Sequence, residues 1–258
     1  MSDELFVKDV MSKPVTIAKS APITEALDKM LADGLDPLIV TNNGGVMGTI
    51  SRVAIAETLG SKKTSTLSPT KIHVANKTDE DFTSVYPDEE AEILIPLLQE
   101  YKVVVVLDEE HRLIGKVDAT DILKVMKPET TTYNLLQNAP VIGPEQRVIH
   151  LRRRMIDEEA TKFIVTEEGE ILGIVTETDV ARAMRDFRLR VEDRHQDNQI
   201  RTILVGDIMT SPALSLEYSA DVSTFIDLIV NKNISSIPVT RDGKVAGIIT
   251  KQALLVAL

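Results

Sequence analysis

Hydrophobic and polar residues along this chain follow the same order four times. Each time, a short extended segment is followed by an amphipathic helix, two strands joined by a polar turn, and a second helix. The extended segments are expected at 14–17, 84–86, 141–142 and 213–216, and the first helices at 22–33, 89–101, 146–158 and 220–231. The last of these helices carries one apolar stripe, formed by Val222, Phe225, Ile226, Ile229 and Val230.

The two strands of each unit are joined by residues suited to a tight hairpin. In the first unit, strands at 38–41 and 46–50 are separated by Asn42-Asn43-Gly44-Gly45, which can supply the positive φ of such a turn. Three strands and two helices make a thin sheet with one uncovered face, so the units should pair to complete a core. Second helices are expected at 51–59, 118–127, 176–187 and 250–257.

Each unit closes on a motif that begins with glycine. The four motifs are Gly48-Thr-Ile-Ser51, Gly115-Lys-Val-Asp118, Gly173-Ile-Val-Thr176 and Gly247-Ile-Ile-Thr250. Two units also open alike, with Val7-Lys-Asp-Val-Met11 before Pro14 and Val205-Gly-Asp-Ile-Met209 before Pro212. These features together resemble the CBS domain, named after cystathionine beta-synthase, over nearly the whole chain. The second unit departs from the pattern in its polar first half, residues 71–83.

The resemblance implies that two repeats pack through their sheets into a Bateman module with two clefts open to adenosine ligands. A four-repeat chain resembles the gamma regulatory subunit of AMP-activated protein kinase and its stand-alone prokaryotic relatives. We therefore expect an α+β / α/β fold of four strand-helix-strand-strand-helix repeats in two modules, forming a flat disc. The first module would span 1–127, with repeats at about 5–60 and 66–127, and the second 128–258, with repeats at about 132–190 and 200–258.

The third closing motif gathers groups that suit a nucleotide. An ionised carboxylate can accept hydrogen bonds from both ribose hydroxyls, and the start of a helix favours negative charge and phosphate. Asp179 would hold the ribose, while Thr176 and Thr178 would face the phosphate. The same residue types also form a capping box, in which hydroxyl and carboxylate only satisfy the free N–H groups of the helix.

Comparison of the repeats favours the ligand over capping alone. Repeats 1 and 4 keep the cap but have Ala54 and Ala253 in place of the acid. They also lack the second hydroxyl that repeats 2 and 3 carry at Thr120 and Thr178. Acid and hydroxyl are thus present together or absent together, as one shared ligand would require, and Asp121 becomes the second predicted ribose ligand.

The resemblance implies that each site combines the closing motif of one repeat with the first strand of its partner, which receives the base. For Asp179 the partner residues are Pro212, Ala213, Leu214, Ile237 and Val239. For Asp121 they are Pro14, Val15, Thr16, Ile39 and Val40. Strand residues of this kind can equally be ordinary core, and the sequence leaves both interpretations open. Each module is expected to keep one competent cleft and one degenerate cleft.

Repeat 2 has Asp118 where the other repeats have Ser or Thr. A carboxylate repels phosphate unless it is protonated or bridged by a cation, so this cleft would take a less negative ligand or stay empty. The alternative is that Asp118 is simply the N-cap of the following helix. Cations for a phosphate are sparse, because the positions of the His-Arg pair of the gamma-subunit relatives correspond to weaker candidates here. These candidates are Lys102, Lys162, Ser235 and Ser236.

Composition removes several other functions. The net charge of −11 argues against a nucleic-acid partner, and the absence of cysteine favours the cytoplasm. No apolar run is long enough to span a membrane. The four histidines are scattered and no phosphate-binding loop with a Gly-Lys-Ser/Thr end occurs, so neither a zinc site nor phosphate transfer is indicated. The arginines between 181 and 201 alternate with acids and suggest a charged linker helix.

We therefore predict a non-catalytic sensor that binds AMP, ADP or ATP, needs no cofactor or metal, and changes its inter-repeat geometry on binding. A target protein would read that change, and the sequence names neither that protein nor whether two chains form a homodimer. The alternatives are a protein-interaction scaffold with vestigial clefts and a sensor of S-adenosylmethionine.

Overall fold

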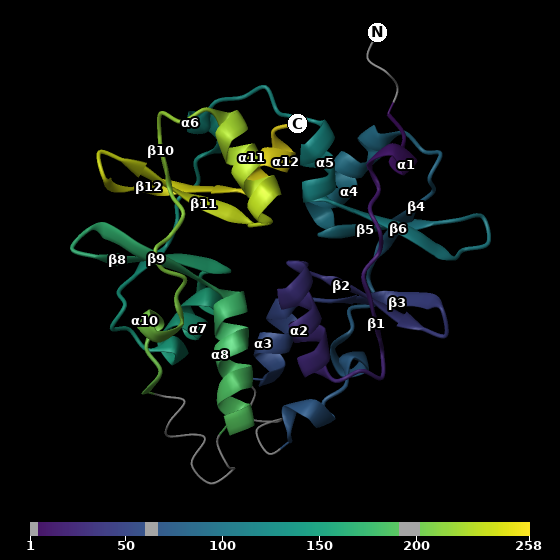
Figure 1. Cartoon of the computed structure of the whole chain (residues 1–258), viewed down its shortest axis with the longest axis horizontal. Coiled ribbons are helices and arrows are strands. Elements are labelled where there is room, and N and C mark those ends of the chain that lie inside the picture. The colour runs from purple at the N-terminus through teal and green to yellow at the C-terminus, as the bar shows by residue number, and fades with distance from the viewer. Residues whose placement is uncertain (1–4, 60–66, 191–201) are drawn as a thin grey trace.

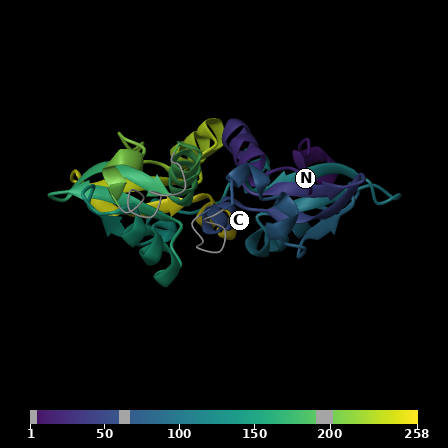
Figure 2. The same cartoon turned by 90° about the horizontal axis from the view of Figure 1, so that it is seen from below.

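A computed structural model describes residues 5–59, 67–190 and 202–258, with side chains of 188–190 excepted. The four repeats surround a common centre in Figure 1, and the edge-on view in Figure 2 shows a body much wider than it is thick. The expected flat disc of four α+β repeats is confirmed. None of the described helices combines the length and apolar character that crossing a bilayer requires.

Each repeat contains one three-stranded sheet with the same topology. The first strand pairs in parallel with the second, and the second pairs antiparallel with the third. Repeats 1 and 2 contain β1 (Thr16–Ala18), α2 (Ile23–Asp33), β2 (Leu38–Asn42), β3 (Gly45–Ile50), α3 (Arg52–Leu59), then β4 (Thr83–Val85), α4 (Leu94–Glu100), β5 (Val103–Leu107), β6 (Leu113–Asp118) and α5 (Ala119–Val125). Repeats 3 and 4 contain β7 (Val141–Ile142), α7 (Val148–Asp157), β8 (Lys162–Glu167), β9 (Glu170–Thr176), α8 (Glu177–Arg190), then β10 (Leu216–Glu217), α11 (Val222–Lys232), β11 (Ser236–Arg241), β12 (Lys244–Thr250) and α12 (Lys251–Val256).

The segments before the first strands contain short helices that the hydrophobic pattern did not predict. These are α1 (Val7–Val10), α6 (Thr132–Leu135) and α10 (Val205–Ile208), with 3-10 turns at Pro69–Lys71 and Val74–Lys77. The predicted helix at 89–101 is divided into a 3-10 turn, Ala91–Ile93, and α4, whose first turn holds Pro96. Of the predicted charged linker helix, α8 is described to residue 190, and 191–201 lie outside the described residues.

The alternation of side chains along each strand separates two environments. In β2, Leu38 and Val40 pack in the hydrophobic core beneath the helices, whereas Ile39 lies on the opposite face and lines a cavity. In β11, Ile237 and Val239 pack with Phe225 and Ile229 of α11. The stripe predicted in α11 is therefore the one that it buries, and the face of each sheet away from its helices is left for the partner repeat.

Repeats pair through the segments that lead into their first strands. Isolated bridges join Ser12 to Lys116, Thr49 to Asp79, Gln137 to Ile248, and Ile174 to Thr210. Each bridge sets a lead-in beside the closing motif of the partner repeat. This close approach explains the glycines, because a Cβ at Gly247 would lie 2.5 Å from the carbonyl oxygen of Gln137.

The two pairs of repeats meet through their helices at the centre of the disc. Helix α3 of repeat 1 packs against α8 of repeat 3, and α12 of repeat 4 packs against α4 and α5 of repeat 2. The cores continue across this contact, since Leu255 of α12 belongs to the core of repeat 2 and Leu123 of α5 to that of repeat 4. A movement of the helices in one pair of repeats would therefore be transmitted directly to the other pair.

Replacement of Gly48 by alanine should destabilise the pairing of repeats 1 and 2. Gly48 has φ +148°, and a Cβ there would collide with the backbone of Asp79 and Glu80. We expect a loss of about 1–3 kcal/mol in the free energy of unfolding, measured by urea denaturation. The control is Gly45→Ala, where the nearest atom to the new Cβ is the carbonyl oxygen of Asn42 at 3.6 Å. Equal stability of the two variants would contradict this explanation of the closing glycines.

Candidate functional site

Asp179 lies in the first turn of α8, is 7% exposed, and is held by the residue that precedes the helix. Its Oδ2 accepts hydrogen bonds from the backbone N–H of Thr176 at 2.9 Å and from the Thr176 hydroxyl at 2.8 Å. This is half of the predicted capping arrangement, and both bonds end on one carboxylate oxygen. Among the described residues, no cation lies within ion-pair distance of Asp179. Burial raises the pKa of Asp179 above its usual value, although the bonds from Thr176 oppose this effect.

The hydroxyl of Thr178 lies at the boundary between the two pairs of repeats. It accepts a hydrogen bond of 3.0 Å from Nη1 of Arg52, the first residue of α3. The other guanidinium bonds run to the carbonyl oxygens of Leu35 at 2.8 Å and Met30 at 3.3 Å, while its Nε is buried without a partner. Arg52 therefore places a fixed positive charge beside Thr178, the residue predicted to face the phosphate.

The same arrangement recurs at the other predicted site. Thr120 accepts a hydrogen bond of 2.6 Å from Nζ of Lys251, the first residue of α12. Repeats 1 and 4, which lack the acid, thus each contribute a cation to the hydroxyl of a repeat that has it. Our interpretation of the sequence missed this, although the signal was present: Arg52 and Lys251 directly follow the caps Ser51 and Thr250.

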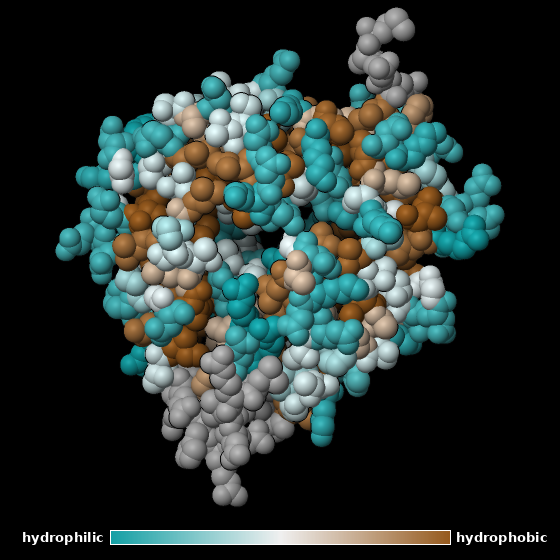
Figure 3. Space-filling view, in the orientation of Figure 1, coloured by the Kyte–Doolittle hydropathy of each residue, from teal (hydrophilic) through white to brown (hydrophobic). Residues whose placement is uncertain are grey.

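The face of the molecule in Figure 3 is hollowed at its centre. Three of the weaker phosphate candidates, Lys162, Lys102 and Ser235, lie close enough to interact. Lys162 faces Thr176 across the β8–β9 ladder and donates to the Ser235 hydroxyl at 3.2 Å. Burial lowers the pKa of Lys162; the charge of Glu177 opposes this, and those of Lys102 and Lys251 add to it. An anion between these lysines would relieve their repulsion.

Lys102 and Ser236, two other predicted phosphate ligands, are less available to a phosphate. Lys102 forms an ion pair of 3.6 Å with Asp36, which also accepts the backbone N–H of Arg52 at 2.9 Å. Ser236 is 8% exposed and is the first residue of β11. Lys162 is therefore the best-placed of the predicted phosphate ligands.

The second predicted ribose ligand, Asp121, is already surrounded by partners. Its Oδ2 accepts from Nζ of Lys116 at 2.9 Å, from the Ser12 hydroxyl at 2.9 Å and from the backbone N–H of Asp118 at 3.1 Å. Nζ of Lys124 lies 3.3 Å from Oδ1. Both oxygens of Asp121 are thus engaged, whereas the described residues engage one oxygen of Asp179.

Asp118 is the N-cap of α5, as the simpler of the two predicted interpretations required. It accepts from the backbone N–H groups of Thr120 at 2.7 Å and Asp121 at 3.2 Å. It also contacts Nζ of Lys116. Burial would raise the pKa of Asp118, but the charges of Lys116 and Lys251 and the hydrogen bonds from Lys116 and Thr120 together lower it. Burial likewise opposes the charge of Lys116, yet the two carboxylates raise the pKa of Lys116.

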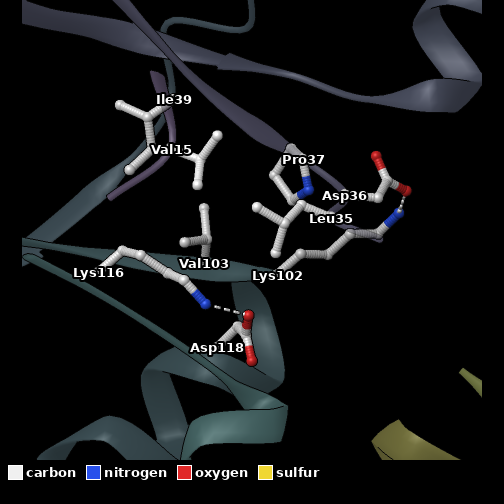
Figure 4. A pocket seen from close by; sticks show the side chains of 9 residues that line it. All are labelled: Val15, Leu35, Asp36, Pro37, Ile39, Lys102, Val103, Lys116 and Asp118. Carbon is white, nitrogen blue, oxygen red and sulfur yellow. Dashed lines mark hydrogen bonds and ion pairs between the residues drawn. The ribbon is translucent and has the colours of Figure 1, made fainter. Parts of the chain in front are cut away.

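The Asp121 cleft retains a small cavity between repeats 1 and 2. Figure 4 shows Val15 and Ile39 on one side and Lys116, paired with Asp118, on the other. The cavity has a volume of about 20 Å³, far below the volume of ligand pockets. The lining residues are Val15, Leu35, Asp36, Pro37, Ile39, Lys102, Val103, Lys116 and Asp118.

A larger cavity of about 270 Å³ lies between the same repeats, in the cleft that has lost its acid. Ser51 and Ala54 of the first closing motif contribute to it, together with Tyr101 and Lys102. Pocket size between these repeats therefore does not follow the presence of the acid.

Three of the predicted base-lining residues are unavailable, which corrects the sequence prediction. Val40, Ile237 and Val239 are fully buried in the cores beneath their sheets. Strand alternation explains the error, since adjacent residues point to opposite faces. Pro238 takes the position in repeat 4 that Ile39 has in repeat 1, because both lie one residue before a Val that pairs with the closing glycine.

The lead-in predicted to receive a base lies beside the Asp179 motif. The backbones of Thr210 and Ile174 bond to one another, and the Ser211 hydroxyl donates to the carbonyl oxygen of Leu172 at 2.8 Å. Pro212 and Leu214 are exposed and Ala213 is half-buried, while Pro14 and Thr16 of the other site are half-buried. Across the described residues, no three His, Asp or Glu side chains are grouped so that they could hold a metal ion.

Replacing Asp179 by asparagine should leave the unliganded protein at least as stable at pH 7. A carboxyl whose folded-state pKa is raised costs stability when ionised, and this cost disappears as the pH falls through that pKa. Asp118→Asn should behave oppositely, because the lowered pKa of Asp118 marks stability that is present at neutral pH and lost in acid. Urea denaturation of both variants tests the contrast. A larger loss for Asp179→Asn than for Asp118→Asn would make Asp179 a structural cap.

Comparisons with known proteins agree with this architecture. The structure of protein MJ1225 from Methanocaldococcus jannaschii, a proposed archaeal homologue of g-AMPK, is 20% identical and matches 97% of this chain and 99% of its own, with a TM-score of 0.80. A conserved protein from Pyrococcus horikoshii is 20% identical and matches 98% of this chain and 100% of its own, with a TM-score of 0.63. These similarities show the fold.

The curated relatives match a smaller part of this chain than these two structures do. An uncharacterised protein of Methanopyrus kandleri, MK0525, is 31% identical over 115 residues, which are 44% of this chain and 54% of that protein. The chain spans about half the length of the curated relatives it matches. The CBS domain profile matches residues 7–61, 74–128, 135–186 and 205–258. The chain therefore belongs to the CBS domain family, with four copies of the domain.

Proposed function

We propose that this protein is a non-catalytic regulatory sensor that binds an adenosine nucleotide of the AMP, ADP or ATP type in the cleft of repeats 3 and 4. The observation that carries the proposal is Asp179, a buried carboxylate at a helix start whose hydrogen bonds from Thr176, within the part of the chain that the structure describes, both end on one oxygen. Its second oxygen can accept from the two hydroxyls of a ribose. Burial disfavours the ionised form of Asp179. A ligand explains the presence of an acid at this buried position better than capping alone does.

Phosphate would be held on the side of the cleft that faces the centre. Thr178 offers a hydroxyl there, Arg52 a fixed guanidinium at 3.0 Å from it, and Lys162 an ammonium opposite Thr176. The N-terminus of α8, a helix of 14 residues, adds its own preference for negative charge. Sugar and phosphate would thus have separate partners around the start of α8.

Binding there would be transmitted because α8 is shared between the cleft and the contact of the two pairs. Thr178 and Asp179 lie on α8, which packs along α3, and Arg52 belongs to α3. A phosphate that draws Arg52 would change how repeat 1 sits against repeat 3. The effect on a target protein is then set by the difference in ligand affinity between the two arrangements. Such a sensor needs no catalytic group, and the relationship of MJ1225 to g-AMPK supports a regulatory role.

Saturating AMP, ADP or ATP should raise the melting temperature of the protein by mass action, and Asp179→Ala should abolish the increase. Loss of hydrogen bonds to a charged group predicts an affinity about tenfold to a hundredfold weaker by calorimetry. Adenosine and S-adenosylmethionine complete the panel. A shift with S-adenosylmethionine alone would point to that ligand, and no shift with any member would leave an interaction scaffold.

Lys162→Gln should weaken AMP binding about tenfold while leaving adenosine binding unchanged, because Lys162 is assigned to the phosphate alone. The control is Lys244→Gln, which removes an equal charge from the exposed start of β12. Calorimetry with AMP and adenosine measures both. Equal weakening of the two ligands would remove Lys162 from the phosphate site.

A further inference from the structure

One position in the closing motif distinguishes repeat 2 from the other three. Thr49, Lys116, Ile174 and Ile248 occupy equivalent places, since each follows the motif glycine and pairs with the lead-in of the partner repeat. The residue after each of them packs in a hydrophobic core: Ile50, Val117, Val175 and Ile249. By alternation, the four equivalent side chains point to the face between paired sheets. Only repeat 2 places a charge there.

The ammonium of Lys116 is buried against both carboxylates of its own motif. Nζ lies 2.9 Å from Oδ2 of Asp121 and contacts Oδ2 of Asp118, while the side chain of Lys116 is 9% exposed. Ser12 and Lys124 complete the surroundings of Asp121. A ribose would therefore have to displace bonds that the chain already makes.

We propose that Lys116 is a built-in counter-ion that closes the Asp121 cleft to nucleotides, so that Lys116 and Asp118 together determine which cleft binds. The inference rests on the proposed function, since it takes Asp121 as the counterpart of Asp179. Breaking a buried ion pair by engaging one partner elsewhere leaves the other charge uncompensated, which strongly disfavours the exchange. The small cavity beside Lys116 and Asp118 is consistent with an occupied cleft.

Lys116 and Asp118, which carry opposite charges, replace two uncharged residues of repeat 3. Lys116 stands for Ile174 and Asp118 for Thr176, so exchanging both changes no net charge. It also avoids the repulsion that Lys116→Ile alone would leave between Asp118 and Asp121. After the double exchange, repeat 2 would read Gly-Ile-Val-Thr-Ala-Thr-Asp, which differs from repeat 3 only at the fifth residue.

The test is calorimetric titration of the full chain with AMP and with adenosine. Wild-type protein should bind about one ligand per chain, and Lys116→Ile/Asp118→Thr about two. Adding Asp121→Asn to the double variant should remove the new site. The reciprocal exchange, Ile174→Lys/Thr176→Asp, should remove the wild-type site. Because Lys116→Ile/Asp118→Thr could unfold the chain, Lys116→Met/Asp118→Asn, which preserves side-chain shape, is measured beside it.

The outcomes separate the two proposals. No binding of either ligand by the wild type would refute the proposed function itself. Wild-type binding that is lost with Asp179→Ala, but no added site in either folded double variant, would overturn the role of Lys116 alone. A wild-type site that disappears when Lys116 is replaced would show that Lys116 contacts the ligand, and this also overturns the inference.

Discussion

A buried carboxylate requires compensation, and the way each closing motif meets this requirement organises the molecule. Asp121 is compensated from within, by an ammonium, a hydroxyl and a backbone N–H. Among the side chains and backbone groups that the structure describes, Thr176 donates the two hydrogen bonds that Asp179 accepts, both on one oxygen. The same motif has thus been completed in repeat 2 and left open in repeat 3. We infer that the open acid marks the site for a ligand and that the neutralised acid marks a cleft that the protein keeps closed.

The central contact between the two pairs of repeats connects the site at Asp179 to the other pair. Arg52 and Lys251 come from the repeats without an acid and bond to the hydroxyls Thr178 and Thr120 of the repeats with one. The loss of the acid in repeats 1 and 4 is therefore accompanied by a cation that serves the opposite pair. A ligand with phosphate at α8 would touch both halves of the disc, whereas a ligand without phosphate would touch one.

Much of this architecture was accessible from sequence because it depends on periodicity and on repetition. Four glycine-led motifs and four amphipathic helices predicted the repeats, and comparison of the motifs singled out Asp121 and Asp179. The prediction was wrong about the direction of three strand side chains, Val40, Ile237 and Val239, which point into the cores. Periodicity shows that side chains alternate along a strand, but it does not show which alternate set faces the helices. Periodicity also could not bring Arg52 to Thr178 or Ser12 to Asp121, because each pair is more than a hundred residues apart, although the place of Arg52 directly after its cap was a signal.

The central claim is that the side chain of Asp179 binds the sugar of an adenosine nucleotide. A crystal structure of the protein grown with saturating AMP tests it most directly. We expect density for one nucleotide with both ribose hydroxyls within hydrogen-bond distance of Asp179, its phosphate toward Thr178 and Arg52, and Lys116 still bound to Asp121. Nucleotide density in another cleft, with the Asp179 carboxylate bonded only to Thr176, would contradict the claim.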